Sequence, residues 1–363
     1  MQSGVLMKRN IRLKQKAVCV KRSVFYGIVI LVFLFIVASF YCDLADYQVY
    51  FNEYYGRNTH TSEIGYTWIS SLFFKLGLPF EVFYAIYMLV FFGILFYFYH
   101  NNLKKTIGFA ILLTAIFPYI NYLQQIRSAM GMGVILLGLC FIDNRHGKLT
   151  LKTVLGYLCT VGIAMTFHIT SFAYIVFLIV LFFKERTVKW LCVLAFPITV
   201  LFVYIVGNGM IVEILQKVPF LGRLMSNFIK YDSGFSKFRL LILVVFYFLF
   251  FLLFFLKKTI SVPYTEKQER MIKYSYAIIA LSNTALITSS AYRLSVIALP
   301  IVYATIIEIT LNIKDYRARS LIFIVLFFVP VSLFGFIWGP FNPEMNNRLL
   351  EEMWRVRDLL YVY

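Results

Sequence analysis

Residues 238–256 read FRLLILVVFYFLFFLLFFL and are followed at once by Lys257 and Lys258. After Arg239 the run contains no charged side chain, and as a helix it would be roughly 28 Å long at 1.5 Å per residue. The hydrocarbon core of a bilayer is about 30 Å thick. The stretch therefore predicts a membrane-spanning helix that ends in a basic flank.

The whole chain shares this apolar composition. Of its 363 residues, 61% are hydrophobic and only 14% are charged, whereas a soluble domain is about a quarter charged. So few charges cannot cover a globular surface, which excludes a soluble enzyme, a disordered chain and a secreted disulfide scaffold. The five cysteines form no CxxC motif. The net charge of +18 does not indicate nucleic acid either, because the basic residues are scattered over short segments between apolar runs.

Ten further apolar runs of helical length predict an all-α polytopic membrane protein with about eleven spans. We expect a basic N-terminus at 1–23, a single membrane domain at 24–338 and a tail at 339–363. The other runs are 24–40, 82–99, 107–119, 128–142, 154–167, 169–183, 190–206, 274–290, 294–312 and 320–338.

Basic flanks predict the orientation. Basic residues stand on both sides of three pairs of apolar runs, which lie within 107–142, 154–183 and 274–312. Basic flanks stay in the cytoplasm, so each pair is predicted to be a hairpin with its turn outside, with the N-terminus inside and the tail outside. The segment 64–78 is predicted to be an amphipathic helix lying in the outer interface. All of the net +18 then falls on the predicted cytoplasmic segments 1–22, 100–106, 143–152, 184–189, 257–273 and 313–319.

Each predicted outer turn carries one basic or titratable side chain in apolar sequence: Arg127, His168 and Arg293. Ionisable groups at a membrane boundary are costly and are functional candidates. Guanidinium groups bind phosphate oxygens through paired hydrogen bonds and would stabilise a departing diphosphate. The alternative is that the arginines snorkel to lipid headgroups and that the histidine packs.

The two longest predicted outer segments offer further candidates. The 208–239 loop combines Arg223 and Arg239 with aromatic residues, which would suit either a glycan wall or an interfacial connector. The first outer loop supplies acids, of which Asp43 and Asp46 would share a helix face. A carboxylate there would deprotonate an acceptor hydroxyl or simply cap a helix. Two carboxylates at this spacing are weak evidence for a metal, and the chain has no P-loop, GxGxxG, HExxH, GxSxG or DxD motif, so no cofactor is assigned.

Five short motifs, taken in order, resemble the EpsG family of polytopic bacterial membrane proteins, which are Wzy-type polymerases of exopolysaccharide, capsule or O-antigen. The resemblance runs from roughly residue 40 to residue 310. Here the family's aspartate has no neighbouring glycine, so either Asp43 or Asp46 is the key acid. The motifs are Asp46-Tyr47-x-x-Tyr50, Glu63-x-Gly65-Tyr66, Gln125-Ile126-Arg127-Ser128-Ala129, Phe167-His168-x-x-Ser171 and Tyr292-Arg293.

The resemblance implies a metal-independent, GT-C-like glycosyltransferase of the bacterial cytoplasmic membrane. Its substrate would be an undecaprenyl-diphosphate-linked oligosaccharide, and a flippase and a chain-length regulator are the expected partners. By the resemblance, Asp46 or Glu63 takes the acceptor proton and His168 binds diphosphate or orients an acid. The residues expected to contact diphosphate or glycan are Arg127, Arg293, Gln125, Tyr50, Tyr66, Ser171, Arg223 and Arg239.

Other functions share some of these features. A flippase of lipid-linked oligosaccharide would place cations on its path, but transporters are expected to show internal repeats or helices broken near the midplane, and the sequence shows neither. A glycan ligase would share almost every feature. A membrane acyltransferase and a non-catalytic scaffold are further alternatives.

Overall fold

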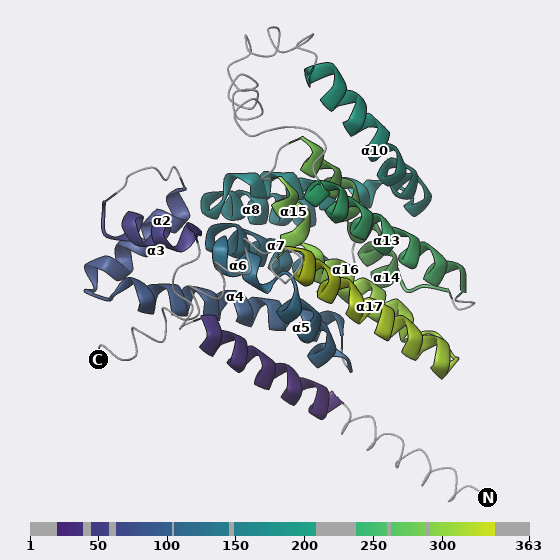
Figure 1. The fold of residues 1–363 in the computed structure, drawn as a ribbon, viewed down its shortest axis with the longest axis horizontal. Coiled ribbons are helices and arrows are strands. Elements are labelled where there is room, and N and C mark those ends of the chain that lie inside the picture. The colour runs from purple at the N-terminus through teal and green to yellow at the C-terminus, as the bar shows by residue number, and fades with distance from the viewer. Residues whose placement is uncertain are drawn as a thin grey trace, which may run out of the picture.

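The computed structural model describes residues 20–38, 45–57, 63–103, 105–144, 149–207, 237–259, 263–287 and 291–337. Within these ranges the regular structure is helical and contains no strand. The helices pack side by side in one bundle, from which α10 diverges (Figure 1). In chain order they are an N-terminal helix at Val20–Ala38, then α2 Ala45–Tyr54, α3 Ile64–Lys75, α4 Phe80–Asn102, α5 Ile107–Ile116, α6 Tyr119–Gln124, α7 Ile126–Asn144, α8 Leu151–Phe167, η1 Ile169–Ile175, α9 Val176–Ile179, η2 Val180–Phe182, α10 Glu185–Gly207, α13 Lys237–Thr259, α14 Glu266–Ser282, η3 Asn283–Leu286, α15 Tyr292–Ile297, α16 Leu299–Thr310 and α17 Tyr316–Ile337.

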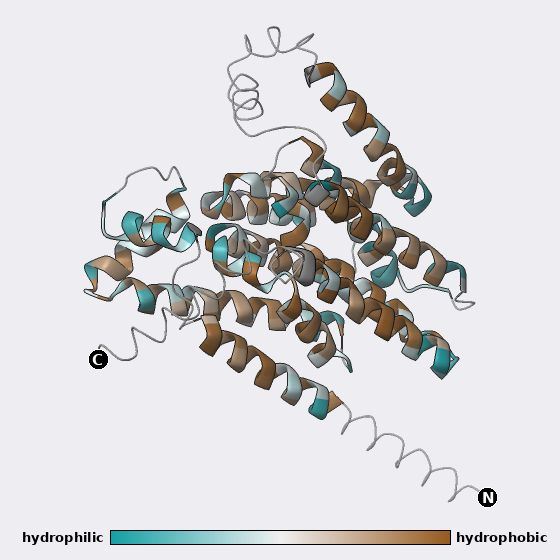
Figure 2. Ribbon diagram, viewed as in Figure 1, coloured by the Kyte–Doolittle hydropathy of each residue, from teal (hydrophilic) through white to brown (hydrophobic). Residues whose placement is uncertain are grey.

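Among the residues that the structure describes, six helices are long and apolar enough to cross a membrane: the N-terminal helix, α4, α7, α10, α13 and α17. Hydrophobic residues run along these helices, and hydrophilic ones gather on α2 and at helix ends (Figure 2). The helix at Ile64–Lys75, predicted to lie in the outer interface, is 12 residues and about 18 Å long. A polytopic membrane protein is confirmed, whereas the total of eleven spans and the orientation stay predictions.

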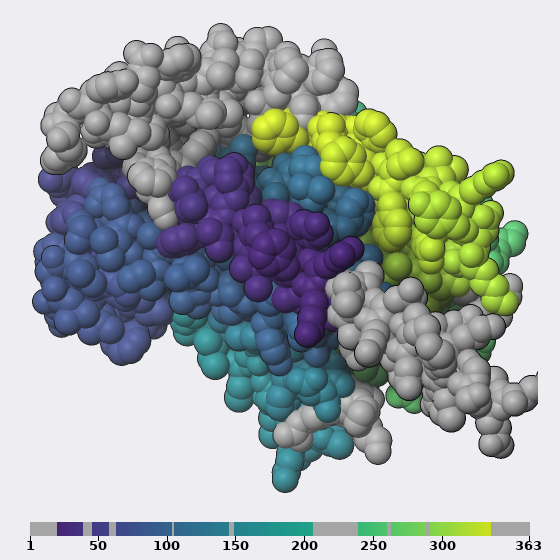
Figure 3. Space-filling model, turned by 90° about the horizontal axis from the view of Figure 1, so that it is seen from below, coloured from purple at the N-terminus to yellow at the C-terminus, as the bar shows by residue number. Residues whose placement is uncertain are grey.

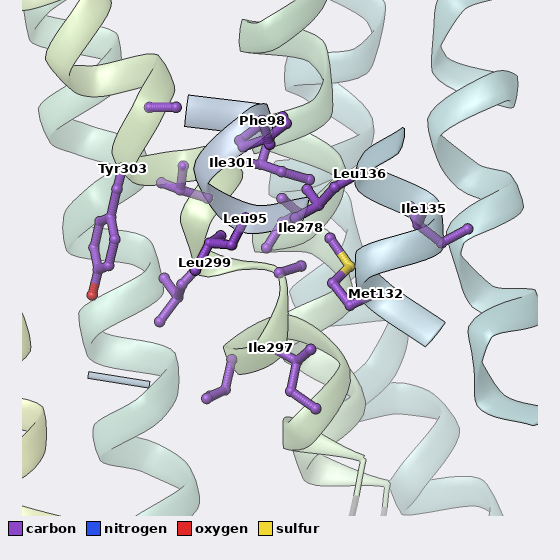
Figure 4. Close-up of a cluster of buried hydrophobic side chains, with 14 of the residues drawn as sticks. Leu95, Phe98, Met132, Ile135, Leu136, Ile278, Ile297, Leu299, Ile301 and Tyr303 are labelled. Atoms are coloured by element: carbon purple, nitrogen blue, oxygen red, sulfur yellow. The ribbon is translucent and has the colours of Figure 1, made fainter. Parts of the chain in front are cut away.

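The core lies between α4, α7, α14 and α16. Figure 4 shows Leu95, Met132, Ile278 and Ile301 among the side chains that meet there. The N-terminal helix lies across the outer surface of α4 and α5 (Figure 3), where Gly27 packs close to Ile111. The N-terminal helix, α10 and α17 leave many large apolar side chains exposed, as expected of helices that face lipid.

Two of the predicted reversals, within 154–183 and 274–312, are present in the chain path. α8 ends at Phe167, His168 is extended, and the chain returns through η1, so that the Tyr157 hydroxyl donates to the Tyr174 carbonyl at 2.9 Å. Likewise the Ser275 hydroxyl of α14 donates to Thr305 of α16 at 2.8 Å. The helix predicted at 274–290 differs, since it begins at Glu266 and ends at Ser282. The reason is a capping box, in which Thr265 and Gln268 satisfy each other's backbone N–H groups.

Tyrosine hydroxyls hold the broken helices together. Wherever a helix stops, its last carbonyls lose their intrahelical partners. Buried tyrosines from neighbouring helices donate to such carbonyls and so fix short elements such as α6 and α15. The bonds are Tyr84 to Leu123 at 3.0 Å, Tyr122 to Ile297 at 3.1 Å, Tyr303 to Phe117 at 3.2 Å, Tyr174 to Leu294 at 2.8 Å and Tyr119 to Leu34 at 2.6 Å.

The helix ends that carry the basic segments are also tied together. Arg270 of α14 pairs with Asp143 of α7 at 3.0 Å, and the Lys267 ammonium donates to the Asn101 carbonyl at 2.7 Å. Lys257 of α13 pairs with Glu185 of α10. These contacts gather the ends of α4, α7, α10, α13 and α14 that the charge pattern predicts to lie in the cytoplasm.

Helix α7 packs so closely on α8 that Gly138 has no room for a side chain. A Cβ there would lie 2.6 Å from Thr160 Cγ2, whereas a Cβ at Gly162 of α8 would meet nothing within 4 Å. We expect Gly138→Leu to destabilise the protein by about 1–3 kcal/mol through overpacking. Gly162→Leu is the control, because it makes the same change of helix propensity. Thermal unfolding of the detergent-purified variants measures both, and equal melting temperatures would contradict this packing.

Candidate active site

Acids from the first segment and cations from the three reversals meet at one end of the bundle. The acids are Asp46 and Glu53 on α2 and Glu63 just before α3. The basic side chains stand where helices begin or break: Arg127 in the first turn of α7, His168 between α8 and η1, and Arg293 in the first turn of α15. Residues more than a hundred positions apart thus form one ionic cluster.

Glu63 is the centre of this cluster. Its Oε1 pairs with Nδ1 of His168, and its Oε2 lies 3.0 Å from Nε of Arg127. The carboxylate is almost completely buried. With Nδ1 on the carboxylate, the His168 ring presents its Nε2 atom to other partners. Glu63 therefore lies between the two basic side chains, hydrogen-bonded to His168 through Oε1 and in an ion pair with Arg127 through Oε2.

Glycine at position 65 makes this contact possible. A Cβ on Gly65 would collide with Thr166 of α8, so only glycine lets α3 approach α8 closely enough. Glu63 stands two residues before Gly65, and His168 stands two residues after Thr166. The spacing of the Glu63-x-Gly65-Tyr66 motif thus has a packing reason.

Arg127 is largely enclosed by acidic and aromatic side chains. Its guanidinium lies 4.8 Å from the centre of the Tyr50 ring and 5.5 Å from that of the Tyr66 ring, and Nη1 lies 3.7 Å from Glu53. Only 18% of its side chain is exposed. Cation–π and ionic contacts together stabilise such a desolvated guanidinium, so Arg127 does not snorkel to the surface.

Asp46 and Arg293 form the open pair of the site. Nη1 of Arg293 lies 3.8 Å from Oδ2 of Asp46, and the side chains are 41% and 35% exposed. Partial burial raises the pKa of Asp46, and the positive charges of Arg293 and then Arg127 oppose the rise. This carboxylate is accessible, weakly paired and easier to protonate than an ordinary aspartate.

The other predicted site residues have different positions. Gln125 is buried at the end of α6, directly before α7. Ser171 is buried in η1, where its hydroxyl faces Gly131 of α7 and its backbone N–H donates to the His168 carbonyl at 2.9 Å. Ser171 therefore shapes the turn that presents His168.

The predicted loop at 208–239 ends earlier than expected, because α13 begins at Lys237. Arg239 is a buried residue in the first turn of α13 and does not belong to an open glycan wall. Arg223 and Asp43 lie outside the described residues.

One contributor to the site was not among the predicted site residues. Glu53 lies seven residues after Asp46 on α2, a helical spacing that would have indicated it. Among the described residues, no group of three or more His, Cys, Asp or Glu side chains is arranged to hold a metal ion.

The sequence model of the EpsG family matches residues 23–348. The chain belongs to the EpsG family. This is the family of Wzy-type polysaccharide polymerases. The match extends the motif resemblance at both ends, to include the N-terminal helix and α17. No curated protein and no solved structure matches the chain. In this EpsG family member, all five motifs supply a side chain to the ionic cluster or to its aromatic walls.

The buried and the open arginine should differ in their effect on stability. Arg127→Met leaves the buried Glu63 short of a partner, and we expect a loss of about 3–5 kcal/mol. Arg293→Met removes a half-exposed pair, and we expect a loss of at most about 1 kcal/mol. Thermal unfolding in detergent measures both. Adding Glu63→Gln to Arg127→Met should recover part of the loss, and equal melting temperatures of the two single variants would contradict the assignment.

Proposed function

We propose that this protein polymerises lipid-linked oligosaccharide repeat units by glycosyl transfer at the outer face of the bacterial cytoplasmic membrane. The growing chain moves from its lipid diphosphate to the end sugar of a new lipid-linked unit. The observation that carries the proposal is the open pair of Asp46 and Arg293 beside the enclosed Glu63–Arg127–His168 group. It offers an accessible carboxylate and an accessible guanidinium next to each other.

The donor diphosphate is expected to bind at Arg293. Its contact with Asp46 is long and half-exposed, so a phosphate oxygen can replace the carboxylate at little cost. Two parallel hydrogen bonds from the guanidinium to a phosphate stabilise the complex more than the 3.8 Å contact with Asp46 does. Arg127 adds positive charge from behind, and His168 Nε2 is the remaining free donor or acceptor of the enclosed group.

Asp46 is the proposed general base. It takes the proton of the acceptor hydroxyl while that oxygen attacks C1 of the donor sugar. The bond between C1 and the diphosphate oxygen breaks, and the lipid diphosphate leaves with the electron pair. Glu63 is the weaker candidate for this role, because its carboxylate is buried between His168 and Arg127.

The position of the cluster favours transfer over transport. The ionisable groups lie where helices begin or break at one end of the bundle, and not halfway along the six long helices. Transporters place their substrate sites near the membrane midplane.

Purified protein in nanodiscs, given one defined lipid-diphosphate-linked repeat unit, tests the function. We expect a ladder of products, and a loss of roughly 10²–10⁴-fold in rate for Asp46→Asn because the proton acceptor is removed. Glu185→Gln, at the opposite end of the bundle, is the control and should keep the ladder. Absence of lipid-linked polymer with the wild type would refute the function, and a normal ladder with Asp46→Asn would refute only the base.

The rate of polymerisation should fall in acid at a higher pH than an ordinary aspartate would produce. The base must be ionised, and burial raises the pKa of Asp46 above its usual 3.8. As the pH is lowered, Asp46 is therefore protonated at a higher pH than an ordinary aspartate, and the base is lost. Initial rates measured at a series of acidic pH values should show this acid limb of the pH–rate profile. The residual activity of Asp46→Asn should lack it, and an unchanged limb in that variant would assign the titration to another group.

A further inference from the structure

Two neighbouring amide side chains, Asn121 of α6 and Gln125 directly after it, are buried without well-formed hydrogen bonds. Asn121 is 0% exposed and Gln125 is 2% exposed, and no amide nitrogen or oxygen of either side chain makes a hydrogen bond of ordinary geometry. The backbone N–H of Gln125 donates to the Asn121 carbonyl at 3.1 Å. The two side chains therefore stand one turn apart on the same face of the helix.

Such a pair is costly. Leaving a buried polar group without a partner costs about 1–3 kcal/mol, and buried side-chain polar atoms in native proteins almost always have one. Four amide atoms without a well-formed hydrogen bond, all within one helical turn, are therefore suited to a ligand that supplies one.

The backbone around the amides is held in place by its neighbours. The Tyr84 hydroxyl donates to the Leu123 carbonyl at 3.0 Å, and the hydroxyl of Tyr122 on α6 donates to the Ile297 carbonyl at 3.1 Å. Helix α6 therefore presents Asn121 and Gln125 from a fixed position, which is what a recognition site requires.

The amides also adjoin the ionic cluster. Gln125 lies two residues before Arg127. Burial raises the pKa of Tyr292 most. Arg293 lowers this pKa, Asp46 raises it, and a contact between the Tyr292 hydroxyl and the Asn121 amide lowers it. The partly exposed Tyr292 side chain therefore contacts Asn121 and lies near the open pair.

We propose that Asn121 and Gln125 form a subsite that binds the sugar directly attached to the donor diphosphate. Each amide offers donors and an acceptor in one plane and carries no charge, which suits neutral hydroxyl or acetamido substituents. The diphosphate would be held by the arginines, and the sugar beside it by the amides once Tyr292 moves aside. This inference rests on the proposed function, because it assumes a diphosphate-linked sugar.

Apolar replacements of similar size, Asn121→Leu and Gln125→Met, test the subsite. Because they remove buried polar atoms without well-formed hydrogen bonds, we expect melting temperatures equal to or above that of the wild type. We expect kcat/KM for a lipid-linked repeat unit to fall roughly 10–100-fold, the effect of losing one or two hydrogen bonds to substrate. Two substrates that differ only in one substituent of the first sugar, acetamido against hydroxyl, should be discriminated by the wild type and much less by the variants.

A matched control separates a structural role from recognition. Thr114 on α5 is equally buried, but its hydroxyl is bonded to the Tyr99 hydroxyl at 2.6 Å and to the Ala110 carbonyl at 3.0 Å. Thr114→Val should lower the melting temperature and leave the discrimination unchanged.

The same variants can be tested by binding alone. Each lipid-linked substrate should raise the wild-type melting temperature by a different amount, and this difference should shrink in Asn121→Leu and Gln125→Met. Lower melting temperatures with intact discrimination would mean that bound water satisfies the amides, which would overturn the subsite. A wild type that binds and discriminates without forming polymer would refute the polymerase and keep the subsite.

Discussion

The buried carboxylate of Glu63 is the constraint on which the site depends. A buried anion must be paired, and Glu63 finds its partners on two other helices, at His168 after α8 and at Arg127 in α7. Those partners place the start of α7 and the end of α8 next to α3. The close approach at Gly65, which a side chain would prevent, is required for the same reason. One carboxylate thus sets the relative positions of three helix ends.

Arg127 carries this constraint further. Its guanidinium touches Glu63 and Glu53 and lies over the rings of Tyr50 and Tyr66, so α2 is bound to the same centre. Asp46 lies one helical turn before Tyr50 on α2 and faces Arg293. The open pair therefore has a rigid support on its acidic side, and it is the part of the cluster that a substrate can reach without breaking a buried contact.

The sequence allowed some of this to be predicted, and for identifiable reasons. Basic residues on both sides of 154–183 imply a reversal, and the chain turns at His168. Placing an ionisable side chain at a membrane boundary costs free energy, and on this ground Arg127, His168 and Arg293 were predicted to be functional. The pairing of Glu63 with both His168 and Arg127 was not predictable, because it depends on which helices are neighbours. The start of α14 was predicted eight residues too far along the chain, at 274 and not at Glu266, because its first two turns are polar and the prediction used hydropathy. The capping box at Thr265 and Gln268 is visible in the sequence and would have indicated the true start. The burial of the Asn121 and Gln125 amides was not predicted, because only a structure shows whether an amide is buried and well hydrogen-bonded.

The charge balance of the cluster bears on how the proposed reaction would proceed. Asp46, Glu53 and Glu63 face Arg127, Arg293 and the titratable His168, so the resting site is close to neutral. A bound diphosphate would add negative charge beside Asp46 and would draw Arg293 away from it. Both changes favour the protonated form of Asp46, so donor binding would make Asp46 a stronger base when the acceptor hydroxyl must lose its proton. Departure of the lipid diphosphate would return Arg293 to Asp46 and favour release of that proton. Arg293 can therefore exchange Asp46 for a phosphate group, while the buried contacts of Glu63 with Arg127 and His168 keep the geometry of the site fixed.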